Sequence, residues 1–163
     1  MKITVLNTGG TFNKVYNPIK GELEVPKDNI ALDEIISNCF NIDFEIKNII
    51  SKDSLEITNE DREFLYQTIK NTHNENIIIV HGTDTIDITS KFLDEKKLDK
   101  KIVLTDAMIP MSIKKVEATL NFSQAIGFLN APIENGIYIC MHGAVAPYEK
   151  LYKNRELGRF LVK

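Results

Sequence analysis

Cysteine is scarce in this chain of 163 residues, and long apolar runs are missing. The two cysteines, Cys39 and Cys140, have neither metal-ligand nor redox spacing, and Cys140 lies in an apolar run that suits a buried thiol. No apolar stretch approaches the roughly 18 residues of a membrane span. Met1 leads almost directly into a predicted strand, so we expect no secretory signal and a cytoplasmic protein.

The chain also lacks a large net charge of either sign. The chain has 20 Lys and Arg against 23 Asp and Glu, a net charge of −3. We therefore expect neither nucleic acid nor a membrane as a partner. The densest cationic stretch, residues 96–101, is interrupted by Asp99 and is typical of a solvated helix end. A hydrophobic content of 43% suits a single globular domain, residues 1–163, with an ordinary core.

Several cofactor and catalytic signatures are absent. The turn at residues 8–11 lacks the third glycine of a dinucleotide fingerprint and the Gly-Lys-Ser/Thr of a P-loop. No Gly-x-Ser-x-Gly elbow indicates a Ser/His/Asp triad. The three histidines, His73, His81 and His142, have no companions at metal-ligand spacing. We expect neither a cofactor nor a metal.

Apolar runs alternate with helical patterns along the chain. Strands are predicted at residues 2–7, 43–50, 77–80, 101–106 and 136–141. Helices are predicted at residues 29–38, 58–71, 84–96 and 114–129. This alternation predicts an α/β fold, in which three α/β/α layers surround a mainly parallel sheet of flavodoxin-like or Rossmann-like type.

Two segments lack a clear period. Residues 12–28 contain two prolines and suit a loop that could include a small hairpin near residues 19–22. Loops of about 15 residues in a compact domain are often functional lids. Tyr16 comes soon enough after Thr11 to fold back over it. Residues 148–159 are interpreted as a polar tail.

Threonine hydroxyls gather at the carboxyl ends of two predicted strands. Thr8 and Thr11 follow the first strand, and Thr83 and Thr85 follow the third, with Asp84 between them. Open α/β sheets bind ligands at this edge. Thr83 or Thr85 could also simply cap the next helix, which is a common structural role. Threonine is a weak nucleophile until a base or charge activates it, so catalysis needs a further partner.

Two motifs together resemble the bacterial-type L-asparaginase family. Residues 8–11, TGGT, are similar to its first signature, and residues 81–85, HGTDT, match its second. Residues 106–110, DAMIP, resemble the family's G-A-M-R-P segment, with Asp and Ile where Gly and Arg are usual. Weak similarity continues through the fifth strand, so the resemblance covers nearly the whole chain.

The resemblance implies catalytic roles residue by residue. Thr11 corresponds to the first catalytic threonine, the nucleophile, and Tyr16 to the mobile-loop tyrosine that eases removal of its proton. Thr83 and Asp84 correspond to the second threonine and the aspartate. Asp84 would also bind the α-ammonium of the substrate.

A catalytic lysine is also implied, in a polar loop after the fifth strand. Spacing from residues 141–145 points to Lys153, with Lys150 as the runner-up. Held against Thr83 and Asp84, such a lysine could accept a proton if burial favoured its neutral form.

Substrate-binding groups are implied by the same resemblance. Ser51 would hold the substrate's α-carboxylate with help from Lys52, and backbone N–H groups near Gly10 and Thr83 could form an oxyanion hole. The full predicted binding set is Gly10, Ser51, Lys52, Gly82, Thr83 and Asp84.

The expected reaction is hydrolysis of L-asparagine to L-aspartate and ammonia through a threonine acyl-enzyme. Two alternatives stay open: an amidase of the same fold for another, glutamine-like amide, and a non-catalytic module that binds asparagine or aspartate. The family's carboxy-terminal domain is not found within these residues. A domain that lacks this partner should expose apolar surface, so we expect a homo-oligomer, a dimer or a tetramer.

Overall fold

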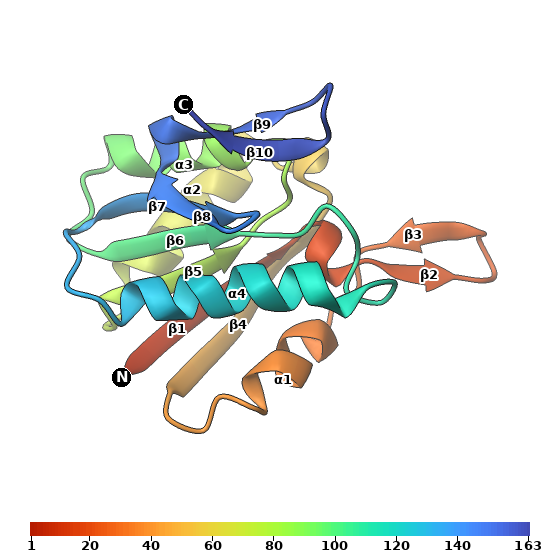
Figure 1. Ribbon diagram of the computed structural model, residues 1–163, viewed down its shortest axis with the longest axis horizontal. Helices are drawn as coiled ribbons and strands as arrows, with labels where there is room; N and C mark the ends of the chain where they lie inside the picture. The colour runs from red at the N-terminus through yellow and green to blue at the C-terminus, as the bar shows by residue number, and fades with distance from the viewer.

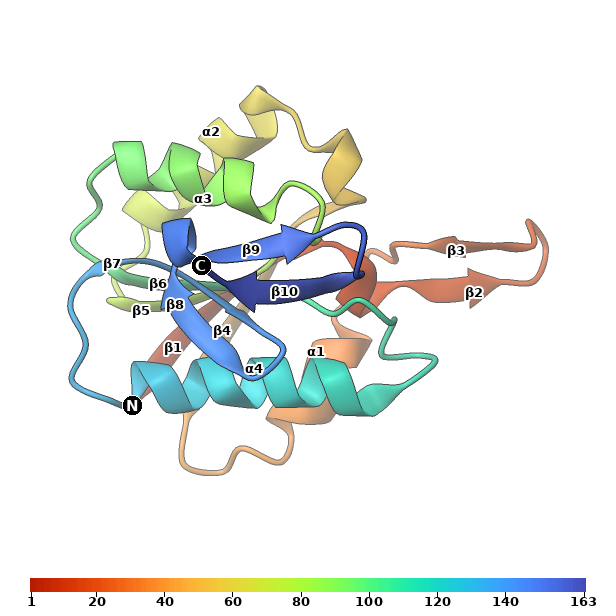
Figure 2. The same ribbon diagram turned by 45° about the horizontal axis from the view of Figure 1, so that its top comes forward.

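The computed structural model describes residues 1–163 as a six-stranded sheet between two layers of helices (Figures 1 and 2). The elements are, in chain order, β1 (Lys2–Gly9), β2 (Val15–Asn17), β3 (Glu22–Glu24), α1 (Ile30–Ile36), β4 (Asp43–Lys52), α2 (Asn59–Lys70), β5 (Asn76–Val80), α3 (Ile86–Glu95), β6 (Lys101–Thr105), α4 (Lys115–Leu129), β7 (Gly136–Met141), β8 (Ala144–Pro147), β9 (Leu151–Asn154) and β10 (Arg159–Val162).

The strands of the main sheet follow the order β4-β1-β5-β6-β7-β8. The first five are parallel, and only β8 runs antiparallel to its neighbour β7. The five parallel strands therefore have the flavodoxin-like order 2-1-3-4-5, and the chain changes direction across the sheet between β1 and β5. The predicted α/β class with a mainly parallel sheet is confirmed.

Each face of the sheet has its own hydrophobic core. On one face Phe122 of α4 packs with Leu32 of α1, and on the other Leu65 of α2 packs with Leu93 of α3. Within β5, residues 78 and 80 point to the first core, whereas residues 77 and 79 point to the second. Burial on both faces explains why the strands consist of unbroken apolar runs rather than alternating ones.

Helix α2 begins as its sequence predicts. The Thr58 side chain accepts a hydrogen bond from the Asp61 N–H, and the Asp61 side chain accepts one from the Thr58 N–H. This reciprocal pair is a capping box. Thr85 precedes α3 but makes no side-chain cap, because its hydroxyl donates to the Ser54 carbonyl instead. The expected threonine cap of α3 is therefore not formed.

One of the two segments without a clear period contains the small hairpin that was expected, and the other contains more regular structure than expected. The predicted loop holds the hairpin β2–β3, which projects from the body of the molecule (Figure 1). The predicted polar tail, residues 148–159, contains β9 and the first residue of β10, and Leu151 within it is buried. Strand β8 comes directly before the tail, and Phe160 of β10, directly after it, is also buried. The interpretation as a tail was wrong, because these four-residue strands bury too few side chains to produce a long apolar signal.

No helix of the structure is long and apolar enough to span a bilayer.

Candidate active site

The loops that follow β1 and β5 meet backbone to backbone at the point where the strand order reverses. Gly10 has a φ of +81°, and a Cβ atom on it would lie 2.5 Å from the amide nitrogen of Gly82. A Cβ atom on Gly82 would in turn collide with the Ser54 side chain. Only glycine permits these approaches. The contact places the loop of Thr11 beside the loop of Thr83.

A buried carboxyl group supports both loops from below. Asp106, directly after β6, has no exposed surface, and its two oxygens accept the N–H groups of Thr11 (3.2 Å) and Phe12 (2.8 Å). Asn121 of α4 donates to the Asp106 carbonyl at 2.9 Å. Burial raises the pKa of Asp106 to about 8, although backbone amides, including that of Thr83, act in the opposite direction.

The four threonines of these loops differ in what their hydroxyls do. The Thr8 hydroxyl donates to the carbonyl of residue 80 at 2.8 Å, and that of Thr85 donates to the Ser54 carbonyl at 2.7 Å. The Thr83 hydroxyl accepts a hydrogen bond and so keeps its own proton available. That of Thr11 has no protein partner, and Thr11 is only partly buried. Thr11 and Thr83 are therefore the two hydroxyls left for chemistry.

Lys153 of β9 reaches the second of these hydroxyls. Its Nζ lies 2.8 Å from Thr83 Oγ1 and 2.8 Å from Asp84 Oδ1. The Lys153 side chain is mostly buried, at 14% exposed. Lys150, in the 3₁₀ turn before β9, makes no side-chain hydrogen bond or ion pair. The structure thus brings Lys153, and not Lys150, to Thr83.

A chain of hydrogen bonds fixes the strand that carries this lysine. Phe160 of β10 is the register partner of Lys153, and its N–H donates to His142 Nδ1 at 3.1 Å. With Nδ1 accepting, His142 Nε2 donates to the Glu117 carboxylate at 2.9 Å. Glu117 of α4 also accepts the N–H of Met108, in the turn after β6. Through His142 and Glu117, the hairpin β9–β10 is thereby connected to the turn that begins at Asp106.

Asp84 has a second cationic partner that the sequence did not suggest for the site. Arg155 donates to Asp84 Oδ1 at 2.5 Å and to the Asp84 carbonyl at 2.9 Å. The hydrogen bond from Lys153, then that from Arg155, holds the pKa of Asp84 below its usual range. The residue type alone gave no reason to assign Arg155 to the site, although it lies only two positions after Lys153.

Three other predicted residues lie apart from these groups. The Ser51 hydroxyl donates to the Asn48 side chain at 3.3 Å, and Lys52 Nζ forms an ion pair with Asp61 at 2.7 Å. Both line a cavity of about 550 Å³ on the α2 side. Tyr16 is 62% exposed on the projecting hairpin and makes no side-chain hydrogen bond. The structure brings neither the Lys52 ammonium nor the Tyr16 ring to the Thr11 hydroxyl.

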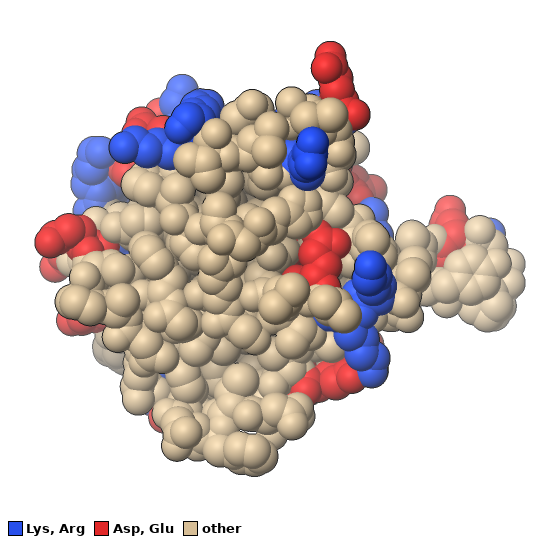
Figure 3. Space-filling view, in the orientation of Figure 1, with Lys and Arg blue, Asp and Glu red and all other residues tan.

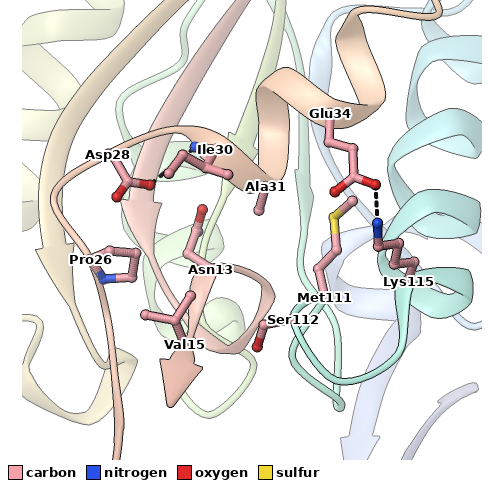
Figure 4. Close-up of a pocket in the computed structure, with 10 residues that line it drawn as sticks. All are labelled: Asn13, Val15, Pro26, Asp28, Ile30, Ala31, Glu34, Met111, Ser112 and Lys115. Carbon is pink, nitrogen blue, oxygen red and sulfur yellow. Dashed lines mark hydrogen bonds and ion pairs between the residues drawn. The ribbon is translucent and has the colours of Figure 1, made fainter. Parts of the chain in front are cut away.

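A smaller cavity of about 220 Å³ opens at the base of the hairpin (Figure 4). Val15 and Pro26 line it on the hairpin side, and Glu34 pairs with Lys115 across from them (Figure 4). None of the predicted site residues lines this cavity. The threonine site is therefore separate from it.

His81 is buried in a closed network. The Arg62 Nε–H donates to Thr89 Oγ1, so the Thr89 hydroxyl donates to His81 Nε2, and His81 Nδ1–H donates to the Gly82 carbonyl. Burial lowers the pKa of His81 to about 4, which fits this neutral form. No group of three or more His, Cys, Asp and Glu side chains could hold a metal ion. We assign His81 a structural role.

Comparison with known proteins agrees with the two motifs and the geometry around them. The family described as "Asparaginase, N-terminal" matches residues 2–158. This chain belongs to the asparaginase family. It is 28% identical over 162 residues to an L-asparaginase of Thermococcus kodakarensis, covering 97% of this chain and 49% of that protein. It is 30% identical to one component of the glutamyl-tRNA(Gln) amidotransferase of Pyrococcus furiosus, covering 86% of this chain and 33% of that protein.

Solved structures of asparaginase-family proteins have the same fold. The thermostable L-asparaginase from Thermococcus kodakarensis superposes with a TM-score of 0.86 at 25% identity, covering 99% of this chain and 51% of that one. A probable cytoplasmic L-asparaginase from Campylobacter jejuni gives 0.82 at 22% identity, with 99% and 52% covered. The chain thus spans about half the length of these relatives. A probable periplasmic L-asparaginase of Haemophilus influenzae is 33% identical, covering 76% of this chain and 37% of that protein, so the cytoplasmic location stays a prediction.

The raised pKa of Asp106 predicts that stability falls with increasing pH. An unfolded aspartate loses its proton near pH 4, whereas folded Asp106 keeps it to about pH 8. The folded state binds one more proton in that window, so the free energy of unfolding falls by at most about 1.4 kcal/mol per pH unit. His81, with its pKa lowered to about 4, opposes this below about pH 6.5. The net fall is expected between about pH 6.5 and 8.

Urea unfolding across this pH range checks the prediction, with Asp106→Asn as the comparison. The variant should lose the pH dependence. It should also be about 1–3 kcal/mol less stable at the acidic end of the range, because an amide nitrogen would face a backbone N–H. Equal slopes in the two proteins would contradict the assignment of this pH dependence to Asp106.

Proposed function

We propose that this protein is an amidohydrolase that converts L-asparagine to L-aspartate and ammonia through a threonine acyl-enzyme. Membership of the asparaginase family supports the reaction class. The observation that carries the proposal is the position of Lys153 Nζ, 2.8 Å from both Thr83 Oγ1 and Asp84 Oδ1. A lysine shared by a hydroxyl and a carboxylate can exchange a proton with that hydroxyl.

The reaction would proceed in two halves. A threonine Oγ attacks the side-chain amide carbon of asparagine while its proton leaves, and the C–N bond then breaks as ammonia takes up a proton. The resulting aspartyl ester is attacked by water, which releases aspartate and returns the proton to the threonine. Thr11 is the proposed first nucleophile, and Lys153 would carry protons through Thr83.

Backbone groups would stabilise the oxyanion of each tetrahedral intermediate. The N–H of Thr11 is turned toward Asp106 at 3.2 Å, so it is not free for this role. The Gly10 N–H is likewise occupied, because it donates to the Lys52 carbonyl at 3.1 Å. The Gly82 N–H is better placed, because it donates to no protein group and lies at the junction of the two loops. Preorganised amides of this kind usually make a large contribution to acyl transfer. No cofactor or metal is needed for these steps.

Two other functions remain as alternatives. A glutamine-like amide could be the substrate of the same machinery, and comparison of turnover on both amides would decide this. A non-catalytic module would bind asparagine or aspartate without releasing ammonia, which calorimetry beside an ammonia assay would reveal.

Ammonia release from L-asparagine tests the proposal in variants of the site. Thr11→Ala, Thr83→Ala and Lys153→Ala should each lower kcat by at least about 100-fold, because each removes a nucleophile or a proton carrier. Thr11→Ser should keep measurable activity because it retains a hydroxyl. Lys150→Ala should behave like wild type and so separates the two candidate lysines.

Circular dichroism would show that these variants are folded. A folded wild type that binds asparagine but releases no ammonia would contradict the hydrolase and favour the binding module. Full activity in Lys153→Ala would remove the central contact from the mechanism.

We also infer that the protein forms a dimer or tetramer through the outer face of α4. Ile113, Val116 and Leu120 are all more than half exposed, and Figure 3 shows few charged side chains across the centre of this face. Exposed apolar patches commonly mark contacts between subunits.

Light scattering after size exclusion at micromolar concentration should give the mass of an oligomer. Leu120→Glu should reduce it to the monomer mass, whereas Ile88→Glu, at an exposed position of α3 on the opposite layer, should not. A wild-type monomer would contradict the inference.

A further inference from the structure

A buried arginine of α2 lacks the carboxylate partner that buried cations usually have. Arg62 is 6% exposed, and its guanidinium donates to two neutral oxygens, Thr89 Oγ1 at 3.1 Å and Asn59 Oδ1 at 3.2 Å. It takes part in none of the ion pairs of the structure. A buried charge without a counter-charge costs free energy. Stability alone therefore does not explain this residue.

The contact with Arg62 decides the direction of the hydrogen bonds that follow it. An arginine N–H can only donate, so Thr89 Oγ1 accepts from it. The Thr89 hydroxyl has one other partner, His81 Nε2 at 2.8 Å, and donates its proton there. The His81 ring consequently carries its own proton on Nδ1, which donates to the Gly82 carbonyl at 3.0 Å. Arg62 thus selects the tautomer of His81.

The last of these hydrogen bonds fixes the peptide that leads into Thr83. In a trans peptide the carbonyl and the N–H lie in one plane and point in opposite directions. His81 Nδ1 binds the carbonyl of the peptide between Gly82 and Thr83, and the N–H of that peptide faces the buried carboxyl group of Asp106. The peptide is therefore held from both sides, which sets the direction of the Thr83 side chain.

That direction matters for the contact with the proposed proton carrier. Lys153 Nζ lies 2.8 Å from Thr83 Oγ1, within the narrow range of a good hydrogen bond. With the opposite tautomer of His81, a lone pair on Nδ1 would face the Gly82 carbonyl oxygen and repel it, so the peptide would lose one of its two contacts. Misplacement of a reacting group by about 1 Å can cost about 100-fold in rate.

We propose that Arg62 is a positioning residue for Thr83. It acts through the Thr89 hydroxyl, the His81 ring and the Gly82 carbonyl, and itself contacts none of the reacting groups. The consequence for catalysis rests on the proposed amidohydrolase function, whereas the control of the His81 tautomer does not depend on it.

Ammonia release by three variants tests the consequence for catalysis. Arg62→Met keeps a long side chain that cannot donate, so kcat for L-asparagine should fall by about tenfold or more with little change in KM. Arg62→Lys keeps a donor and should restore part of that loss. Leu65→Ala removes a buried side chain three positions further along α2, so it should lower stability but leave kcat unchanged. Wild-type kcat in Arg62→Met, or an equal loss in Leu65→Ala, would overturn the proposal.

Nitrogen-15 NMR of the His81 ring keeps the test independent of turnover. The wild type should show a neutral ring with its proton on Nδ1, in agreement with a pKa that burial lowers to about 4. In Arg62→Met the proton should move in part to Nε2, and the Thr83 amide should exchange with deuterated water at least about threefold faster. Leu65→Ala should keep the wild-type tautomer.

The two measurements separate the inference from the reaction. If the wild type releases no ammonia while Arg62→Met changes both the His81 tautomer and the exchange of the Thr83 amide, the positioning role stands and the hydrolase does not. An unchanged tautomer in Arg62→Met, or the same change in Leu65→Ala, would overturn the role of Arg62.

Discussion

The buried carboxyl group of Asp106 is the constraint on which the candidate site depends. It accepts the amides of Thr11 and Phe12 and faces that of Thr83, so two loops more than 70 residues apart in the chain share one support. Glycine at positions 10 and 82 is the steric condition for that arrangement, because a side chain at Gly10 would collide with the Gly82 backbone and one at Gly82 with the Ser54 side chain. The threonine hydroxyls are thus positioned by backbone geometry.

The lysine reaches the site by a different route, from the last hairpin of the chain. Its strand partner Phe160 is bonded to His142, which is bonded to Glu117 on α4. Helix α4 also holds Asp106 through Asn121. One helix therefore positions both the support of the threonines and the strand of Lys153, although it contributes no reacting group to the proposed mechanism.

Much of the fold could be predicted because the parallel strands are buried on both faces. Runs such as residues 77–80 are recognisable because they are wholly apolar, and Thr58 indicates the start of α2. The hairpin β9–β10 could not be predicted in this way, since strands of four residues leave only Leu151 and Phe160 buried. Short strands that are half solvated resemble polar loops.

The residues of the candidate site also differ in how far the sequence could predict them. Thr11, Thr83 and Asp84 lie in motifs at strand ends, so residue type and position suffice to find them. The choice of Lys153 over Lys150 depends on the course of the hairpin, which spacing alone left open. The position of Asp106 at the end of a strand could be predicted from the sequence. Its hydrogen bonds to backbone amides about 95 residues away could not, because residue types do not encode such contacts.

A crystal structure with bound L-aspartate would directly test whether Thr11 and Thr83 form one catalytic site. The β-carboxylate of aspartate should lie within hydrogen-bond distance of both the Thr11 and Thr83 hydroxyls. A ligand that touched neither hydroxyl, or that occupied the cavity at the base of the hairpin, would contradict it.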